Sequence, residues 1–288
     1  MIISIASGKG GTGKTTIATN LAVVLANNNC DTAYLDCDVE EPNGRIFLKP
    51  EINEQIDVTV PVPRVDMSKC TLCGACSSAC QFHAIVVLGK IVEVFEPLCH
   101  GCGGCSDICP ENAITETPRK IGYINHGIGM GVNFYEGRLN VGEAISTPVT
   151  KALRKINHKS EITIIDAPPG TSCPVIEAVN DTDYVILVTE PTPFGLNDLI
   201  LAVSMIRQLN LPFGVIINRC DIGNSETDNY CLQENIDVLA RLPYNRKIAE
   251  TYSGGNIYIG MDDDYEKILL EIFLKIKNRT HHDRISCR

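Results

Sequence analysis

The fold is decided by residues 8–16, which read Gly8-Lys9-Gly10-Gly11-Thr12-Gly13-Lys14-Thr15-Thr16. This stretch matches the pattern G-x-x-x-x-G-K-[ST]. It follows the apolar run MIISIAS (1–7), typical of a buried strand, and precedes residues 14–28, whose apolar side chains have helical spacing. Glycines let backbone N–H groups turn toward an anion, and the N-terminus of the following helix adds the positive end of a dipole. The sequence therefore predicts a phosphate-binding loop between a strand and a helix.

The lysine and threonine that end this loop indicate which phosphate ligand it takes. We expect Lys14 to bridge the β- and γ-phosphates of a nucleotide and Thr15 to ligate Mg²⁺. The other residues of 8–16 contribute backbone contacts to the phosphates. The expected ligands are thus ATP or ADP with Mg²⁺.

Beyond the loop, apolar runs alternate with helical segments along most of the chain. Such alternation is typical of a parallel sheet with helices on both faces. We therefore predict an α/β fold, a P-loop NTPase with a mostly parallel sheet flanked by helices. A last amphipathic helix at 264–277 is expected to pack against the sheet, with a membrane-surface helix as the alternative. The further strands are expected at 32–38, 162–165, 184–188 and 213–217, and the further helices near 174–180, 196–209 and 228–235.

Residues 60–118 interrupt this alternation. The segment is bounded by proline-containing stretches and contains eight of the chain's 14 cysteines. It also carries an internal repeat, since C-x2-C-x2-C-x3-C begins at Cys70 and again, 29 residues later, at Cys99. We predict that 60–118 is an inserted α+β ferredoxin-like domain within a discontinuous ATPase domain formed by residues 1–59 and 119–288.

The cysteine spacing indicates two [4Fe-4S] clusters of the bacterial ferredoxin type. In this pattern three closely spaced thiolates hold three corners of one cluster, and the fourth cysteine of the run ligates the other cluster. The ligands expected for the first cluster are Cys70, Cys73, Cys76 and Cys109. The ligands expected for the second are Cys80, Cys99, Cys102 and Cys105.

Two features of the cysteine segment leave alternatives open. C-x2-C pairs also build zinc sites, although each zinc ion would need two such pairs. The usual Cys-Pro ending is present at Cys109 but is replaced by Cys80-Gln81, which weakens a turn preference and removes no ligand. His83 and His100 neighbour cluster cysteines, and we expect them at the surface, with a hydrogen bond to sulfur as the alternative.

The second residue of the phosphate loop, Lys9, gives the chain a family resemblance. The sequence GKGGTGKTT resembles the deviant Walker A motif of the MinD/ParA/Mrp/nitrogenase-iron-protein superfamily. In that superfamily the early lysine reaches the partner's phosphates in a nucleotide-sandwich dimer. The resemblance therefore implies a homodimer with Lys9 acting in trans, and the alternative is a solvated loop lysine. The resemblance covers residues 1–45 and 120–275.

The same resemblance implies roles for five further residues. Asp38, in LDCD, resembles the switch I aspartate that orients the attacking water, and Asp166, in DAPPGT, resembles the switch II aspartate that holds Mg²⁺ through water. The Gly170 N–H would sense the γ-phosphate, and Asn218 would read the adenine edge unless it is only a turn asparagine. Cys173 resembles the cluster-ligating switch II cysteine of the nitrogenase iron protein; we expect it to serve structural packing, and a labile-cluster ligand at a dimer interface is the alternative. The implied catalytic residues are Lys9, Lys14 and Asp38, and the implied Mg²⁺ site contains Thr15, Asp38 and Asp166.

Composition and charge narrow the function classes. The net charge of −10 disfavours non-specific binding to DNA or RNA, which needs a basic surface. The chain opens directly on a strand, without a signal peptide, and has no apolar stretch of membrane-span length, so we expect a cytoplasmic protein and no membrane anchor. Clustered cysteines in a reducing compartment favour metal ligation over disulfides.

Together these features imply an ATPase with slow intrinsic hydrolysis and three candidate uses. The first is electron transfer through the two clusters to a redox partner protein, coupled to nucleotide state. The second is an Mrp-like carrier that assembles iron–sulfur clusters or delivers them to an acceptor protein. The third is a positioning ATPase like MinD or ParA, which the acidic charge disfavours. Clusters that resist a chelator favour the first use, and clusters lost to an apo acceptor on addition of ATP favour the second.

Overall fold

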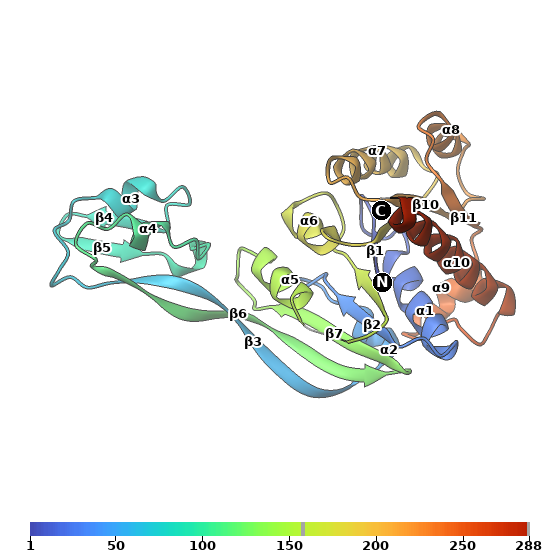
Figure 1. Ribbon diagram of the computed structural model, residues 1–288, viewed down its shortest axis with the longest axis horizontal. Helices are drawn as coiled ribbons and strands as arrows, with labels where there is room; N and C mark the ends of the chain where they lie inside the picture. The colour runs from blue at the N-terminus through green and yellow to red at the C-terminus, as the bar shows by residue number, and fades with distance from the viewer. Residues whose placement is uncertain (157–158, 287–288) are drawn as a thin grey trace.

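The computed structural model describes residues 1–156 and 159–286, with side chains described up to residue 280 (Figure 1). Within these residues the main sheet has nine strands in the order β11-β10-β9-β1-β8-β2-β7-β6-β3. All pairings from β11 to β7 are parallel, as the sequence predicts. The parallel strands are β1 (Ile2–Ala6), β2 (Thr32–Asp36), β7 (Val132–Leu139), β8 (Ile162–Asp166), β9 (Tyr184–Thr189), β10 (Phe213–Asn218) and β11 (Val238–Leu242).

Helices cover both faces of this sheet and divide its core in two. Neighbouring strand residues point to opposite faces, so Ile164 and Ile165 of β8 lie in different apolar clusters. One face is covered by α1 (Lys14–Asn27), α2 (Gly44–Leu48) and α10 (Asp263–Ser286), and the other by α5 (Thr147–Arg154), α6 (Cys173–Val179), α7 (Pro193–Gln208) and α8 (Glu226–Gln233). A further helix, α9 (Arg246–Ser253), follows β11.

The terminal helix packs as expected, because Leu269 and Ile276 of α10 are fully buried against α1 and the sheet. Its apolar face is therefore part of the core and is not a membrane-surface element. None of the helices in the described part of the chain combines the length and hydropathy needed to cross a membrane.

Two long antiparallel strands, β3 (Glu51–Val65) and β6 (Ile114–Gly129), complete the sheet at one edge. Near the body, β6 also pairs with β7 through residues 122–129 and so belongs to the main sheet. Farther out, 60–65 and 114–119 pair only with each other. Pro61 and Pro63 are tolerated there because β3 is an edge strand, whose outward N–H groups have no ladder partner to lose.

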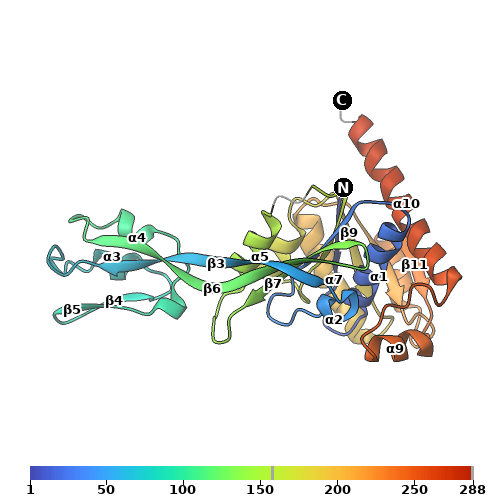
Figure 2. The same ribbon diagram turned by 90° about the horizontal axis from the view of Figure 1, so that it is seen from below.

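This two-stranded ribbon carries a small lobe away from the body, as both views show (Figures 1 and 2). The predicted insert 60–118 corresponds to the free part of the ribbon together with the lobe. The lobe contains α3 (Ala75–Ala79), the hairpin β4 (Ile85–Leu88) and β5 (Ile91–Val94), a 3₁₀ turn at Glu96–Leu98 and α4 (Gly104–Asp107).

The sequence repeat in the lobe is also a repeat of backbone geometry. The N–H of Asp66 donates to the carbonyl of Ala113, and 29 residues later the N–H of Phe95 donates to the carbonyl of Ala84, both at 2.7 Å. The two halves thus close on each other around a local pseudo-twofold arrangement. Residues with positive φ recur at the same offset, in the pairs Leu72 and Gly101, Gly74 and Gly103, and His83 and Asn112.

Candidate functional site

The phosphate loop connects the end of β1 to the start of α1, as the sequence predicts. Gly13, at the N-cap of α1, has φ 94°, and a Cβ there would overlap the side-chain amide of Asn218. Gly8 is required for a different reason, because a Cβ on it would overlap the backbone of Asp198 in α7. Close packing from two other elements therefore holds the loop against the sheet edge.

The loop leaves an anion site at the N-terminus of α1. No side chain caps the helix, so its first backbone N–H groups point toward the loop without a capping acceptor. The hydroxyl of Thr12 is buried, and among the described residues it has no hydrogen-bond partner. Open N–H groups, a helix dipole and a free buried hydroxyl are what a bound phosphate group uses.

Lys14 and Asp166 form the buried ion pair of this site. Lys14 Nζ contacts Asp166 Oδ1 across 152 positions of sequence, and both side chains are buried. The other carboxylate oxygen of Asp166 accepts a hydrogen bond from the Tyr34 hydroxyl at 2.9 Å. Both oxygens of Asp166 are thus held in place from β2 and α1.

Two more carboxylates interact with the same lysine. Asp36 is fully buried and accepts a hydrogen bond from the Gly44 N–H at 2.8 Å. Burial, followed by the charge of Asp166, raises the pKa of Asp36 well above its usual range. Burial also raises the pKa of Asp38 to about 6, against the opposing charge of Lys14. Burial alone would lower the pKa of Lys14, but the carboxylates outweigh it and raise that pKa.

The site therefore sets three carboxylates against one lysine. In the part of the chain that the structure describes, these carboxylates do not converge closely enough to hold a metal ion by themselves. Their oxygen atoms are of the kind that Mg²⁺ takes alongside water and phosphate oxygens. Asp38 and Asp166 are the residues that the sequence proposes for this cation, and Asp36 is a third carboxylate that sequence reasoning missed. The D-x-D spacing in LDCD (35–38) could have indicated Asp36, because it places a second aspartate at the end of the same strand.

Lys9 does not join the buried ion pair. It lies in the outer part of the loop, where its Nζ is 3.8 Å from Glu190 Oε2 and its side chain is 31% exposed. Glu190 also accepts a bond from Arg219 at 2.6 Å, so Lys9 is the weaker of its two partners. The Lys9 ammonium is therefore free to leave this contact.

Two predicted nucleotide contacts are engaged within the chain. The Gly170 N–H donates to the carbonyl of Ser7 at 2.9 Å, and Asn218 Nδ2 donates to the carbonyl of Thr12 at 2.8 Å. The Asn218 Oδ1 accepts the Arg219 N–H at 3.0 Å, so both ends of this amide are satisfied. Asn218 thus braces the phosphate loop, a role that its position after a strand did not reveal.

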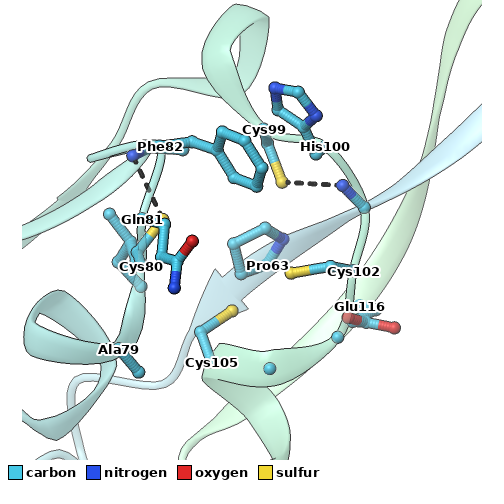
Figure 3. A pocket seen from close by; sticks show the side chains of 15 residues that line it. Pro63, Ala79, Cys80, Gln81, Phe82, Cys99, His100, Cys102, Cys105 and Glu116 are labelled. Carbon is cyan, nitrogen blue, oxygen red and sulfur yellow. Dashed lines mark hydrogen bonds between the residues drawn. The ribbon is translucent and has the colours of Figure 1, made fainter. Parts of the chain in front are cut away.

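The cysteines of the lobe surround two cavities. The first, here called the proximal cavity, has a volume of about 270 Å³ and lies at the ribbon pair Pro63 and Glu116. Figure 3 shows its sulfur atoms turned inward. Cys80, from the first repeat, joins the triplet of the second repeat there, which is the grouping that the spacing predicts. The cysteines that line the proximal cavity are Cys80, Cys99, Cys102 and Cys105.

The second cavity lies farther out along the ribbon, against Val65 and Ile114, and is here called the distal cavity. Its volume is about 20 Å³, which is room for about one water molecule. Cys109, from the second repeat, joins the triplet of the first repeat. The cysteines that line the distal cavity are Cys70, Cys73, Cys76 and Cys109.

Backbone N–H groups point at the sulfur atoms in both halves of the lobe. The Ala84 N–H donates to Cys80 Sγ at 3.3 Å, and the Ala113 N–H donates to Cys109 Sγ at 3.4 Å, at equivalent positions of the repeat. Burial raises the pKa of the Cys105 thiol to about 11. The cavities therefore offer dipoles that stabilise thiolates, and the half-buried Cys105 thiol stays protonated unless a metal replaces its proton.

The arrangement of ligands differs from that of a single-ion site. Among the described residues, no group of three or more His, Cys, Asp or Glu side chains converges closely enough to hold one metal ion. The cysteine sulfurs instead stand around the two cavities. His83 and His100 are exposed, as expected, and His100 stacks on Phe82 with ring centroids 3.5 Å apart.

Cys173 is separate from the cysteines of the lobe. It is exposed at the first residue of α6, directly after the switch II segment. The expected packing role is therefore wrong, because an exposed side chain at the start of a helix fills no core position. Within this single chain, no other cysteine joins it in a metal-binding group of the described residues.

Comparison with known proteins places the nucleotide site in a family. The chain matches the family model of the CobQ/CobB/MinD/ParA nucleotide binding domain over residues 3–257. It is 30% identical over 272 residues to an uncharacterised protein of Methanocaldococcus jannaschii, covering 91% of this chain and 93% of that protein. It is 24% identical over 305 residues to the iron-sulfur cluster carrier protein of Pyrococcus furiosus, covering 96% of this chain and 85% of that protein.

Solved structures agree on the fold. The septum site-determining protein MinD of Pyrococcus horikoshii, complexed with Mg-ADP, has a TM-score of 0.56 and 20% identity, covering 94% of this chain and 93% of its own. At that identity the likeness shows the fold alone. Because the family match includes the phosphate loop, both aspartate segments and most of the sheet, this chain belongs to the CobQ/CobB/MinD/ParA nucleotide-binding domain family.

Proposed function

We propose that the protein is a dimeric ATPase that couples its nucleotide state to electron transfer through two [4Fe-4S] clusters in the lobe. The observation that carries the proposal is the grouping of the eight cysteines. Each cavity gathers three cysteines of one repeat and the fourth cysteine of the other repeat. This crossed grouping is what two-cluster ferredoxins use.

The residues present fit clusters better than they fit zinc. A tetrahedral zinc ion needs its thiolates to converge on one point, whereas these thiolates stand around a cavity. The proximal cavity is roomy enough for a compact inorganic group, and the lining of the distal cavity must open to take one. Cys73 lies on the exposed side of the distal cavity and can move outward. When bound, each cluster would take up and release one electron.

The nucleotide half of the proposal follows from an exchange of partners. Lys14 bonds to Asp166, and the Gly170 N–H bonds to the carbonyl of Ser7. To contact the β- and γ-phosphates, both donors must leave these acceptors. Asp166 is then free to face a hydrated Mg²⁺, with Thr15 and Asp38 beside it, and Asp38 orients the attacking water. Mg²⁺ supplies positive charge at the phosphates.

Switch II therefore changes its contacts whenever nucleotide binds or leaves. Because α6 begins at Cys173, directly after this segment, the change is transmitted to a helix that packs on α5. We propose that this movement alters how the lobe is presented to a redox partner. Reading of adenine by Asn218 stays a prediction, since the Asn218 amide would first have to release Thr12.

Dimer formation is supported by the position of Lys9. This lysine lies outside the buried ion pair, and among the described side chains its ammonium pairs with Glu190 at 3.8 Å. In a nucleotide-sandwich dimer of the deviant Walker A type, Lys9 would reach the partner's phosphates and stabilise charge in the transition state. The homodimer is thus the proposed working unit, and slow hydrolysis is expected from a single chain.

A second candidate function is delivery of iron–sulfur clusters to an acceptor protein. It is favoured by the exposed position of Cys173 and by the similarity to the iron-sulfur cluster carrier protein of Pyrococcus furiosus. In a dimer, two Cys173 residues could hold a labile cluster between the chains. A positioning role like that of MinD is supported by the fold alone and is not proposed.

The proposal is tested by anaerobic purification, iron and sulfide analysis, and EPR spectra with and without Mg-ATP. We expect iron and sulfide equivalent to two [4Fe-4S] clusters per chain and a spectrum that changes with nucleotide. Two matched variants, Cys102→Ser in the proximal cavity and Cys73→Ser in the distal cavity, should each remove one cluster. Stoichiometric zinc in place of iron would overturn the proposal.

Cluster transfer separates the two candidate functions. Clusters that stay bound during a chelator challenge and during ATP turnover support electron transfer. Transfer of a cluster to an apo acceptor on addition of ATP supports delivery, and Cys173→Ser should then abolish it. Cys220→Ser is the matched control, because Cys220 is half-buried and lies outside switch II.

A further inference from the structure

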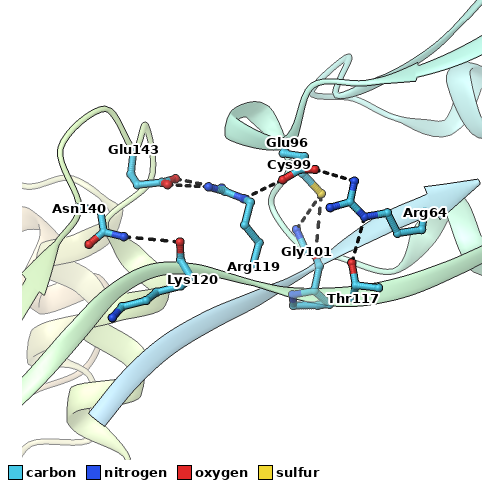
Figure 4. A network of polar contacts seen from close by, with 10 residues as sticks. Arg64, Glu96, Cys99, Gly101, Thr117, Arg119, Lys120, Asn140 and Glu143 are labelled. Atoms are coloured by element: carbon cyan, nitrogen blue, oxygen red, sulfur yellow. Dashed lines mark hydrogen bonds and ion pairs between the residues drawn. The ribbon is translucent and has the colours of Figure 1, made fainter. Parts of the chain in front are cut away.

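A set of four charged residues connects the body to the lobe (Figure 4). These residues, here called the junction network, are Arg64, Glu96, Arg119 and Glu143. Arg119 Nη1 and Nη2 bond to the two carboxylate oxygens of Glu143 at 2.5 and 2.9 Å. Glu96 lies on the other side, with Oε2 at 4.0 Å from Arg119 Nε and Oε1 at 2.7 Å from Arg64 Nη1.

The junction network spans three parts of the molecule. Glu143 follows β7 in the body, Arg119 lies on β6 where the ribbon leaves the sheet, and Glu96 lies in the lobe just before Cys99. Arg119 is 17% exposed, so the ion pair with Glu143 is partly shielded from solvent. A bidentate, shielded pair fixes the direction of the guanidinium better than a surface pair does.

Cys99 lies against the ribbon beside Arg119, because Cys99 Sγ is 4.0 Å from the carbonyl oxygen of Pro61, and Pro61 pairs with Pro118, the neighbour of Arg119. The bond to Glu143, together with the charges of Glu96 and Cys99, raises the pKa of Arg119 despite burial. The guanidinium therefore stays positive beside the cysteine that lines the proximal cavity on the body side. Arg64, by comparison, is 56% exposed and pairs with Glu96 alone among the ion pairs of the described residues.

We propose that Arg119 tunes the reduction potential of the cluster in the proximal cavity, and that Glu143 makes this tuning respond to nucleotide. The inference rests on the proposed function and identifies the contact through which its two halves communicate. Reduction of a cluster by one electron adds one negative charge and breaks no bond. A fixed cation nearby stabilises the reduced form, so the potential rises with the positive charge that Arg119 presents.

A short stretch of backbone links the nucleotide site to the loop that carries Glu143. Val39, directly after Asp38, accepts a hydrogen bond from the Leu139 N–H at 2.9 Å. Glu143 lies in the loop that Leu139 begins. A shift of the Asp38 segment on Mg-ATP binding therefore displaces the loop that holds Glu143. When Glu143 moves relative to Arg119, its negative charge compensates the guanidinium to a different degree. The electrostatic potential at the proximal cavity then changes.

The test is an EPR-monitored redox titration of the holoprotein and four variants, with dithionite as the electron donor. Arg119→Gln should lower the equilibrium constant for reduction of one cluster about tenfold, which for a one-electron couple is about 59 mV. Glu143→Gln should shift the same couple in the opposite direction, because it leaves Arg119 uncompensated. Arg119→Lys keeps the charge and should stay near the wild type.

Lys120→Gln is the matched control. Lys120 is the next cation on β6, but its Nζ pairs with Asp57 of β3 at 2.5 Å, away from the lobe cysteines. Its removal should leave both potentials unchanged. Iron and sulfide content is measured in every variant, because a disrupted lobe would lose clusters, whereas tuning shifts a potential with the clusters retained.

Opposite shifts for Arg119→Gln and Glu143→Gln, in one of the two couples, support the inference. Equal shifts in both couples, or none with full clusters, overturn it. The nucleotide part is supported if Mg-ATP and Mg-ADP give different potentials in the wild type and the same potential in Glu143→Gln. If the wild-type protein contains no iron, the proposed function itself is wrong. If the wild-type cluster potential responds to nucleotide but Arg119→Gln does not shift it, the proposed function stands and only the role of Arg119 is wrong.

Discussion

The nucleotide site and the cysteine lobe are stabilised in different ways. The nucleotide site joins residues that are far apart in sequence, such as Lys14 at the start of α1 and Asp166 at the end of β8, and the strands β2 and β8 that position it are buried along their whole length. The lobe uses residues that all lie between Cys70 and Cys109, and its helices α3 and α4 bury no residue. The body is held by hydrophobic burial, whereas the lobe has little apolar core of its own.

The difference indicates which region depends on metal for folding. A segment of this size does not bury enough apolar surface to offset the entropy of ordering its chain. Small domains of that kind need disulfides or metal. We therefore expect the body to fold without iron and the lobe to depend on it.

The largest expected effect comes from removing the proximal cluster. In Cys105→Ser, hydrogen exchange of residues 66–113 should lose most of its protection, because a thiolate ligand and its cluster are lost together. Exchange in β1 and β8 should not change, and ATP affinity should stay within about threefold. Cys220→Ser serves as the control. Equal loss of protection in the body would break the comparison between the two regions.

The next effect concerns the body alone. Lys14→Ala should weaken ATP binding about 100-fold or more, because the loop loses its buried cation at the phosphates. Asp38→Ala is the matched variant, which should keep ATP binding and slow turnover about 100- to 1,000-fold. Affinity is measured by calorimetry and turnover by phosphate release. Wild-type turnover by Asp38→Ala would remove Asp38 from the mechanism.

A smaller effect is expected where the loop is braced. Asn218→Ala removes the hydrogen bond to the Thr12 carbonyl and leaves that carbonyl unpaired, which costs about 1–3 kcal/mol. ATP affinity should fall about tenfold, and the iron content of the lobe should not change. Asn229→Ala, at an exposed position of α8, is the control and should leave ATP affinity unchanged. An unchanged affinity would mean that the brace contributes nothing to the loop.

The smallest effect is a pH dependence of the body without Mg²⁺ or nucleotide. Because the folded-state pKa of Asp38 is raised to about 6, its stabilising contribution is present below the unfolded pKa, near 4, and is lost as pH rises through about 6. Stability should fall by on the order of 1 kcal/mol between pH 5 and pH 7.5. In urea unfolding, Asp38→Asn should make the free energy of unfolding nearly independent of pH in this range. If the pH dependence is unchanged in this variant, it arises from Asp36 instead.

Much of the fold could be read from short sequence patterns. The strand, loop and helix around Gly8–Thr16, and the alternating elements after residue 160, lie where their periodicity predicts them. The long strand β3 could not be read in this way. Val58, Val60 and Val62 do alternate along β3 and are buried, but Pro61 and Pro63 lie within the same run. Proline is unfavourable inside a strand unless the strand lies at the edge of a sheet, and only the tertiary structure shows that β3 is an edge strand.

The site shows the same division. The glycines, Lys14 and the spacing of the eight cysteines follow from sequence, because a tight turn, a phosphate and a cluster each require particular residue types at short separations. Sequence did not indicate that Tyr34 holds Asp166, that Asn218 braces the loop or that Arg119 meets Glu143. Each of these contacts joins residues on different strands or loops, and only the packing of the sheet decides which side chains meet there. The residue types that bind phosphate or a cluster can therefore be recognised from the sequence, whereas the contacts between side chains on different strands are determined by the tertiary structure.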